Sequence, residues 1–141
     1  MNTSTKVKLI MPILYAVLAG IFFVLTWPDN IRLNHIAGVL ITMVAFLLWL
    51  AARVQLGNAF SIGAEANYLV SKGLYSKLRH PVYYFSILAV IGISVYVWSL
   101  FMLIPIGLLL FLEIYRINKE EEILTNKFGK TYTDYKAKTW F

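Results

Sequence analysis

GLYSKLRHPVY, residues 73–83, joins a polar, turn-rich segment to a long apolar one. Arg79 and His80 stand directly before Pro81, whose fixed φ and missing N–H suit the first turn of a helix. Both side chains are therefore predicted at a helix entrance, at a membrane surface. A second polar cluster, RINKEEEILTNKFG (116–129), follows the apolar segment. If the apolar segment folds back as a helical hairpin, the two clusters meet and form a site.

The second cluster places several ionisable side chains on one helix face. Arg116 and Glu120 are four residues apart, and Glu113 lies above them on the same face. Glu113 is also the only Asp, Glu, Lys, Arg or His from Pro81 to Tyr115. A carboxylate in an apolar run is costly unless it faces protein or water. Glu113 is therefore expected either to pair with Arg116 or to line the site.

The composition indicates an integral membrane protein. Of the 141 residues, 60% are apolar and 14% are charged, and the mean hydropathy is +0.70. A soluble domain normally carries about 25% charged residues. The chain has no cysteine, which excludes disulfides, thiolate chemistry and Cys-ligated metals, and no metal site is predicted.

Four apolar segments are predicted to cross the membrane. The first runs from Leu9 to Trp27; it has nearly the 20 or so residues of a full span and no small-x-small cleavage site, which argues against a signal peptide. The second runs from about Ile36 to Ala52. A single helix from Pro81 to Tyr115 would be roughly 50 Å long, against a hydrocarbon core of about 30 Å. This segment is therefore expected to reverse between Ser94 and Pro105, where the proline can break or kink the helix.

Two further segments are expected outside the bilayer core. Arg53 to Arg79 is a polar connection rich in turn formers, with apolar residues interleaved that predict packing against the protein. Ile117 to Phe141 is basic and amphipathic, which suits a segment lying on the membrane surface. The predicted fold is all-α, a single membrane domain over residues 1–141, with about four transmembrane helices and a C-terminal amphipathic helix.

The positive charges predict the orientation. In the four-helix arrangement Arg32 alone falls on one side, and the remaining 12 of the 13 Lys and Arg residues fall on the other: Lys6, Lys8, Arg53, Lys72, Lys77, Arg79, Arg116, Lys119, Lys127, Lys130, Lys136 and Lys138. Both termini are thus expected in the cytoplasm. The net charge of +6 is accounted for by membrane orientation and anionic lipid, and a nucleic-acid partner is not predicted.

Five ordered blocks resemble the isoprenylcysteine carboxyl methyltransferase family, which is related to the phospholipid N-methyltransferases. They are LG (56–57), LVSKGLY (69–75), RHPVY (79–83), R-x-x-x-E-E-x-x-L (116–124) and FGKTYTDY (128–135). The likeness covers residues 56–141, whereas residues 1–55 resemble only generic membrane helices.

The resemblance implies a membrane methyltransferase that uses S-adenosyl-L-methionine and acts on a lipid-like or prenylated amphiphile. Catalytic positions would be Arg116, Glu120 and Arg79, with Arg116 facing the substrate. The cofactor would be bound from the connection, the helix entrance and the fourth helix by Asn67, Tyr68, Leu69, Val70, Tyr75, His80, Pro81, Val82, Tyr83, Glu120 and Glu121.

These residue types suit the chemistry. Methyl transfer from a sulfonium is an in-line displacement, so the protein mainly positions the reactants and excludes water. Glu120 can bind the ammonium or ribose hydroxyls of the cofactor, and tyrosine faces can attract the sulfonium by about 0.5–2 kcal/mol. Arg116 can hold a carboxylate or phosphate in a two-pronged manner.

Two other classes of function remain open from the sequence. Membrane sterol reductases are similar to this family in their cofactor half, and such a protein would use NADPH. A non-catalytic membrane protein could keep the same scaffold, because basic flanks and an Arg116–Glu120 pair also occur as ordinary features of membrane helices. No Rossmann glycine pattern is present, so neither cofactor would bind in the manner of soluble domains.

Overall fold

The computed structural model describes residues 3–57 and 69–140, with side chains from residue 13 onward. The chain divides into two compact units, residues 1–32 and residues 33–141. The first unit contains helix α1 (Thr3–Leu25). Its end lies just before Pro28, and the Thr26 hydroxyl donates back to the Phe22 carbonyl at 2.7 Å. The predicted first helix is confirmed as a helix.

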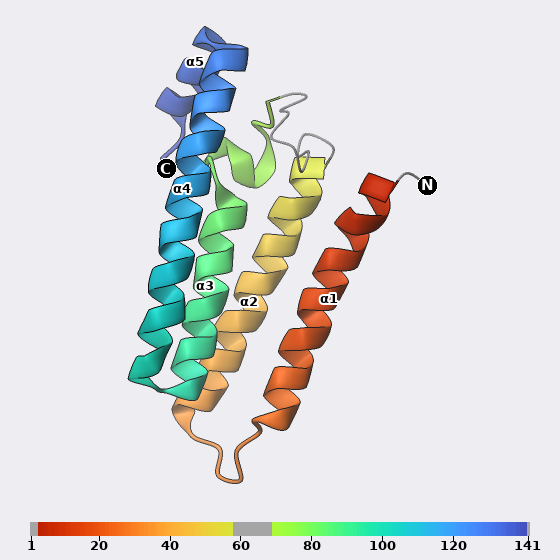
Figure 1. Ribbon diagram of the computed structural model, residues 1–141, viewed down its shortest axis with the longest axis vertical. Coiled ribbons are helices and arrows are strands. Elements are labelled where there is room, and N and C mark those ends of the chain that lie inside the picture. The colour runs from red at the N-terminus through yellow and green to blue at the C-terminus, as the bar shows by residue number, and fades with distance from the viewer. Residues whose placement is uncertain (1–2, 58–68, 141) are drawn as a thin grey trace. The chain divides into compact units, whose positions relative to one another are not determined.

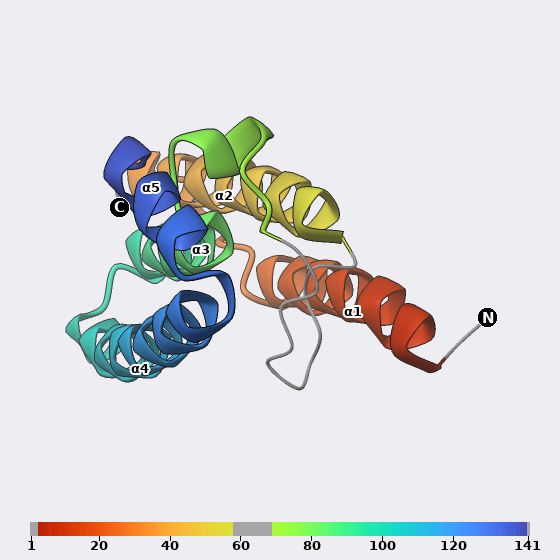
Figure 2. The same ribbon diagram turned by 90° about the horizontal axis from the view of Figure 1, so that it is seen from above.

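The second unit contains the helices that carry the predicted site. In chain order they are α2 (Leu33–Leu56), the 3₁₀ helix η2 (Gly73–Ser76), α3 (Pro81–Val97), the 3₁₀ helix η3 (Leu100–Met102), α4 (Leu103–Phe128) and α5 (Lys130–Lys138). Figures 1 and 2 show α3 between α2 and α4. The parts of the chain that the structure describes contain no strand. The all-α prediction is confirmed.

Small residues bring α2 and α3 into close contact. A Cβ atom added at Gly38 of α2 would lie 2.6 Å from the Tyr96 Cα, and one added at Gly92 of α3 would lie 2.7 Å from the Thr42 backbone nitrogen. Gly38, Thr42 and Ala45 are buried, at the helical spacing that makes one stripe. Close backbone approach through small residues is typical of helix pairs in membranes. This pair fixes the position of α3.

The second helix and the connection differ from the predicted boundaries. α2 continues to Leu56, so Arg53 lies within the helix and not at the start of the connection. Good helix formers in Ala52–Leu56 favour this extension. Near the end of the connection, the Leu74 backbone N–H donates to Gln55 Oε1 of α2 at 2.7 Å. The neighbouring Gly73 has a positive φ of 63°, which glycine adopts without a Cβ clash. Part of the connection is thus tied to the end of α2.

The predicted reversal between α3 and α4 is confirmed, but its cause is different. Trp98 ends α3 in a left-handed conformation with φ 50°, and its backbone N–H donates to the Ser94 carbonyl. The Ser99 hydroxyl then accepts from the Phe101 N–H at the start of η3. Pro105 is the third residue of α4, where a backbone N–H needs no partner within the helix. The expectation that Pro105 breaks or kinks the helix is wrong.

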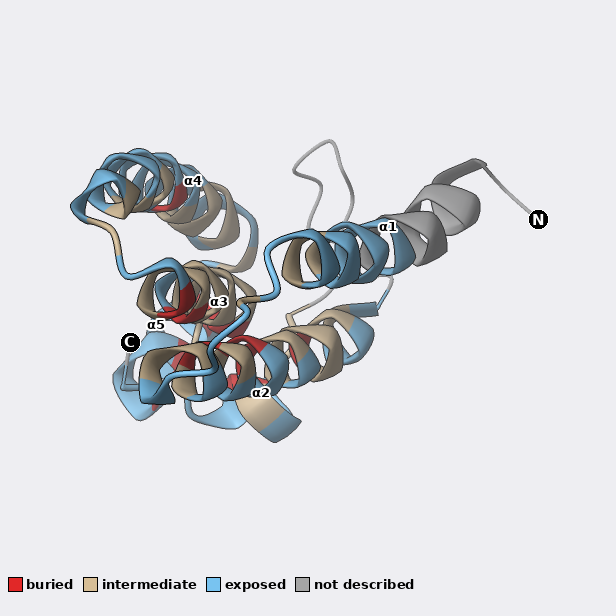
Figure 3. Cartoon of the chain, turned by 90° about the horizontal axis from the view of Figure 1, so that it is seen from below, coloured by how far each residue is buried: buried red, intermediate tan, exposed pale blue. Residues whose placement is uncertain are grey.

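α4 is one continuous helix that carries both an apolar half and the second polar cluster. It runs to Phe128 and ends at Gly129, whose φ is 50°. Most of its side chains are exposed, as Figure 3 shows, and Glu113 is its one buried residue among those described. Residues 117–128 are therefore part of α4, and only the remainder of the predicted tail forms a separate helix.

Among the residues whose side chains the structure describes, two segments are helical, long and apolar enough to span a bilayer. They are α2, with 24 residues, and the segment Leu100–Phe128, with 29. The part of α1 with described side chains (Ile13–Leu25) and α3 (Pro81–Val97) are shorter apolar helices; at 17 residues α3 is about 25 Å long. Apolar helices of this kind fit a membrane protein. The count of four spans stays a prediction.

α5 folds back against the 3₁₀ helix η2. Tyr132 and Tyr135 occupy one face of α5 and are buried. The Tyr135 hydroxyl donates to the Tyr75 carbonyl of η2 at 2.6 Å, and the Trp140 N–H donates to the Lys77 carbonyl at 2.9 Å. Figure 1 shows α5 and η2 at the same end of this unit. The predicted surface position of the tail on a membrane stays a prediction.

Candidate functional site

A shallow recess lies where the end of α2, the 3₁₀ helix η2, the start of α3 and the polar part of α4 meet. It is lined by Leu56 of α2, Tyr75 of η2, Arg79 and His80 before α3, Val82 and Tyr83 of α3, and Glu120 of α4. Its lining combines aromatic rings with side chains of both charges. The predicted convergence of the two polar clusters is confirmed.

His80 is held at the first turn of α3 by its backbone. Its carbonyl accepts from the N–H groups of Tyr83 and Tyr84 at 3.1 and 3.3 Å, with Pro81 at the first helical position. Its imidazole makes no capping bond, and the side chain is 3% exposed. The side chain therefore points to the site, and only the backbone of His80 caps the helix.

The imidazole of His80 lies between two adjacent glutamates. His80 Nδ1 is 3.4 Å from Glu120 Oε2, and His80 Nε2 is 3.5 Å from Glu121 Oε1. Neither Glu120 Oε2 nor His80 Nε2 has a hydrogen-bond partner, although both atoms are buried. In each contact an imidazole nitrogen therefore lies close to a carboxylate oxygen without the geometry of a hydrogen bond.

Four buried polar atoms without a hydrogen-bond partner gather around this point. They are Arg79 Nε, His80 Nε2, Glu120 Oε2 and Tyr132 OH. Most buried polar atoms in folded proteins are hydrogen-bonded, and leaving one unpaired costs about 1–3 kcal/mol. The four atoms here include donors and a carboxylate acceptor. Such a group is suited to a polar ligand with charges of both signs.

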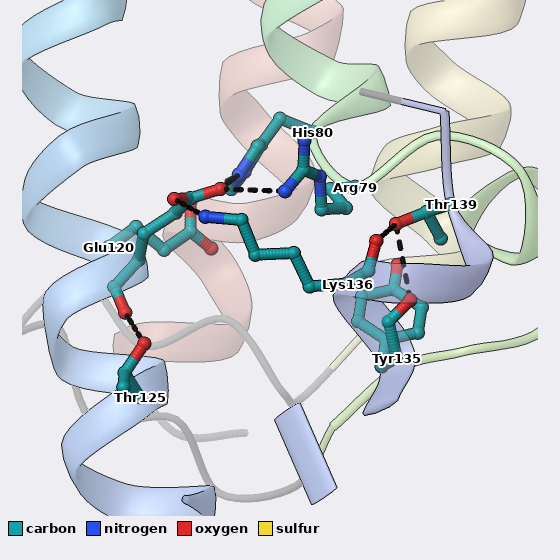
Figure 4. A network of polar contacts seen from close by, with 8 residues as sticks. Arg79, His80, Glu120, Thr125, Tyr135, Lys136 and Thr139 are labelled. Carbon is teal, nitrogen blue, oxygen red and sulfur yellow. Dashed lines mark hydrogen bonds and ion pairs between the residues drawn. The ribbon is translucent and has the colours of Figure 1, made fainter. Parts of the chain in front are cut away.

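Glu121 makes the ion pairs at the same end of the unit. Its Oε1 atom is 3.3 Å from Arg79 Nη1, and its Oε2 atom is 2.7 Å from Lys136 Nζ. Figure 4 shows the Arg79 and Lys136 side chains of this network reaching toward α4. Glu121 thereby joins α4 to the α3 entrance and to α5. Glu120 lies beside it in sequence but faces the recess. The two glutamates have different surroundings.

Two tyrosines outside the apolar spans stay protonated. Burial raises the pKa of Tyr75, and the neighbouring Glu120 raises it further. Burial likewise raises the pKa of Tyr132, with Glu121 as the next cause. Both hydroxyls are therefore neutral at physiological pH and can donate a hydrogen bond.

The structure brings together only some of the residues predicted for the site. The recess contains Tyr75, Arg79, His80, Val82, Tyr83 and Glu120. Pro81 is fully buried, Leu69 and Val70 are half-buried, and none of the three lines it. Asn67 and Tyr68 lie outside the described residues. The roles of all these positions in binding stay predictions.

Arg116 and Glu113 do not form the pair that was one expectation. Arg116 is exposed and makes no ion pair or hydrogen bond with another described residue. Glu113 instead lies 3.0 Å from the Ser86 hydroxyl of α3. Arg116 lies outside the recess, so its side chain remains available at the exposed surface of α4.

Three residues at this end of the unit were not predictable as part of the site: Leu56, Tyr132 and Lys136. Leu56 belongs to the LG block, and the other two belong to or follow the FGKTYTDY block. The spacing of Tyr132 and Tyr135 places both on one helix face, which is a signal for packing. No signal in the sequence indicates that this face meets η2.

The family model of the phospholipid methyltransferases (PEMT) matches residues 33–131, which is more than half of the chain. The chain belongs to the phospholipid methyltransferase family. No curated protein and no solved structure matches the sequence.

The family match covers the whole recess. All seven lining residues of the recess lie within residues 33–131. Membership in a membrane methyltransferase family agrees with the apolar helices. The closer likeness to the isoprenylcysteine carboxyl methyltransferases stays a prediction.

Proposed function

We propose that this phospholipid methyltransferase family member is an integral membrane enzyme that transfers a methyl group from S-adenosyl-L-methionine to a lipid-like or prenylated amphiphile. The observation that carries the proposal is the group of unpartnered buried atoms in and beside the recess. A family of methyltransferases requires a methyl donor, and this group of atoms suits the amino-acid end of that donor.

The chemistry of the unpartnered atoms fits a zwitterion. Arg79 Nε and Tyr132 OH can donate to a carboxylate, and His80 Nε2 can do so when it carries the proton. Glu120 Oε2 can accept from an ammonium group. Bonds to charged groups contribute about 1.5–3 kcal/mol each. The amino-acid part of S-adenosyl-L-methionine has one carboxylate and one ammonium.

The chain's own residues have three tasks in the reaction. Glu120, Arg79 and His80 hold the charged end of the donor at the recess. Tyr75 and Tyr83 present aromatic rings there, where a positive charge is attracted to a ring face by about 0.5–2 kcal/mol. When bound, S-adenosyl-L-methionine supplies an electrophilic methyl group. Arg116, exposed on α4, is available to orient an anionic part of the acceptor.

The test is equilibrium binding of S-adenosyl-L-methionine to the purified full-length protein in nanodiscs, measured by calorimetry. We expect Glu120→Gln to weaken binding by about 1.5–3 kcal/mol, which corresponds to roughly 10- to 150-fold in Kd. Glu122→Gln is the matched control, because Glu122 is exposed on the same helix and does not line the recess. The control should bind as the wild type does.

The same titration separates the competing functions. Binding of NADPH in place of S-adenosyl-L-methionine would favour the reductase alternative. A wild-type protein that binds neither would favour a non-catalytic scaffold. Equal affinity in the wild type and in Glu120→Gln would remove Glu120 from the cofactor site.

A further inference from the structure

The apolar face of α5 is already covered by the protein. Tyr132 and Tyr135 are buried, as is Thr139 directly after the helix, and the Tyr135 hydroxyl donates to the Tyr75 carbonyl of η2. The exposed residues of α5 are Lys130, Thr131, Thr133, Asp134, Lys136, Ala137 and Lys138. None of these exposed residues is a large apolar one. α5 therefore has no apolar face left with which to lie on a membrane.

Trp140 differs from α5, because its side chain projects from the folded protein. It is 71% exposed, although its backbone N–H donates to the Lys77 carbonyl at 2.9 Å. Thr139 before it is buried and has an extended conformation. Side chains alternate along an extended backbone, so the burial of Thr139 directs its neighbours Lys138 and Trp140 outward. The backbone thus holds an exposed indole in a fixed place.

Two ammonium groups accompany this indole. Lys77 Nζ lies 5.7 Å from the centre of the Trp140 ring, which is within the range of a cation–π contact. Lys138 is exposed two residues before Trp140. Neither lysine forms an ion pair with a described residue, and neither does Asp134, one turn before Lys138. The surface made by Lys77, Lys138 and Trp140 is therefore open to an anion.

The place of this surface in the fold points to the membrane boundary. Lys77 precedes Pro81 by four residues, and Pro81 begins the apolar helix α3. Tryptophan is enriched where a membrane meets water, because its ring has an apolar body and one N–H donor, and lysine can place its ammonium among the head groups. A soluble anion would neutralise the two charges but leave the ring exposed. A lipid, with a head group next to acyl chains, would do both.

We propose that Lys77, Lys138 and Trp140 form a binding surface for the head groups of anionic phospholipids. The two ammonium groups contact phosphate oxygens, and the indole lies beside the upper part of the acyl chains. A lysine next to an anionic leaflet contributes roughly fivefold to association. The tail of the chain then meets the membrane at this surface, and the apolar face of α5 stays against the protein. The inference does not depend on a bound cofactor.

The first experiment locates the Trp140 ring in nanodiscs. Trp27, Trp49 and Trp98 are replaced by Phe, so that Trp140 is the sole tryptophan. Brominated phosphatidylcholine, which quenches indoles that lie against acyl chains, should lower its fluorescence at least about twofold. A matched protein with Trp140→Phe and Thr133→Trp should be quenched little, because Thr133 is exposed, away from the buried face of α5. An unquenched Trp140, or equal quenching of both proteins, overturns the inference.

The second experiment tests the choice of lipid with the same sole-tryptophan protein. Brominated phosphatidylglycerol and brominated phosphatidylcholine are compared at one small mole fraction in dioleoylphosphatidylcholine nanodiscs. Quenching should show the anionic lipid enriched beside Trp140 at least about fivefold, and less at high salt, because two lysines attract it. Lys77→Gln combined with Lys138→Gln should reduce the enrichment to about twofold or less. Lys127→Gln is the control, an exposed lysine in the last turn of α4, and should keep the enrichment.

Three outcomes of the second experiment overturn the proposal. The first is equal quenching by the two lipids, and the second is enrichment that persists in the double variant. The third is loss of the enrichment when inorganic phosphate is added at constant ionic strength, which would assign the lysines to a soluble anion. The comparison of the two lipids keeps both lysines, so it does not depend on how the double variant folds.

Discussion

Replacing Glu121 by Gln should lower the free energy of unfolding and leave the affinity for S-adenosyl-L-methionine nearly unchanged. The Glu121 carboxylate lies 3.3 Å from Arg79 Nη1 and 2.7 Å from Lys136 Nζ. It therefore links three elements, the α3 entrance, α4 and α5. Gln keeps the shape of the side chain and removes the charge, so both ionic contacts are lost while the packing remains.

The exposure of each partner sets the size of the effect. The Lys136 side chain is 48% exposed, so its pair contributes about 0.5 kcal/mol, as exposed pairs do. The Arg79 and Glu121 side chains are 17% and 22% exposed. Their pair lies between the exposed case, at most about 1 kcal/mol, and the buried case, where removal of one partner costs about 3–5 kcal/mol. We expect a loss of about 1.5–2.5 kcal/mol in the free energy of unfolding.

The assay is unfolding by SDS titration in mixed micelles, followed by circular dichroism, with Glu122→Gln as the control. The folded Glu121→Gln variant should bind S-adenosyl-L-methionine within about threefold of the wild type. The reasoning is refuted if Glu121→Gln is as stable as the control but loses cofactor affinity as Glu120→Gln is expected to. Glu121 would then be a cofactor ligand, which is the role that the family resemblance implies.

Three further predictions follow from the packing, the exposed arginine and the charge pattern. Gly92→Ala should lower the free energy of unfolding by about 1–3 kcal/mol, because its Cβ would meet the Thr42 backbone nitrogen at 2.7 Å. Gly107→Ala is the control: Gly107 has open space around it, so this variant should be as stable as the wild type or more stable, and equal stability of the two variants would contradict the close α2–α3 contact. Arg116→Lys should lower kcat/KM on the lipid acceptor and keep cofactor affinity, because a lysine ammonium lacks the two-pronged geometry; parallel loss of both would assign Arg116 to the cofactor. Leu100 and Thr131 are both exposed, and single cysteines at these positions should be labelled from opposite sides of the membrane. Thr131→Cys should be labelled from the cytoplasm; labelling of both variants from one side would refute the orientation.

Local sequence rules account for much of the fold. The composition indicates a membrane protein, and Pro81 marks the start of α3 because proline is favoured at the first helical position. The apolar segment after it is too long for one span, which requires a reversal. These conclusions depend on properties of single residues and on segment length. The exact turn was not predictable, because Trp98 adopts a left-handed conformation that glycine usually takes.

The site was predictable as a meeting of two clusters, but not in its division of roles. Spacing places Arg116 and Glu120 on one face of α4. Glu120 and Glu121 are neighbours in sequence, about 100° apart around the helix, and nothing local indicates which of them faces the recess. The rotation of α4 against α3 decides this, and it leaves Glu121 to Arg79 and Lys136.

The membrane class, the helices, the reversal and the residue types of the site follow from composition, periodicity and segment length. Which segments meet depends on the tertiary structure. The Tyr135 hydroxyl reaches the Tyr75 carbonyl across 60 residues, and the Ser86 hydroxyl reaches Glu113 across 27. Such contacts depend on how whole helices pack through the small residues of α2 and α3. Periodicity within one helix specifies a face, but the partner of that face is set by the arrangement of all the helices together.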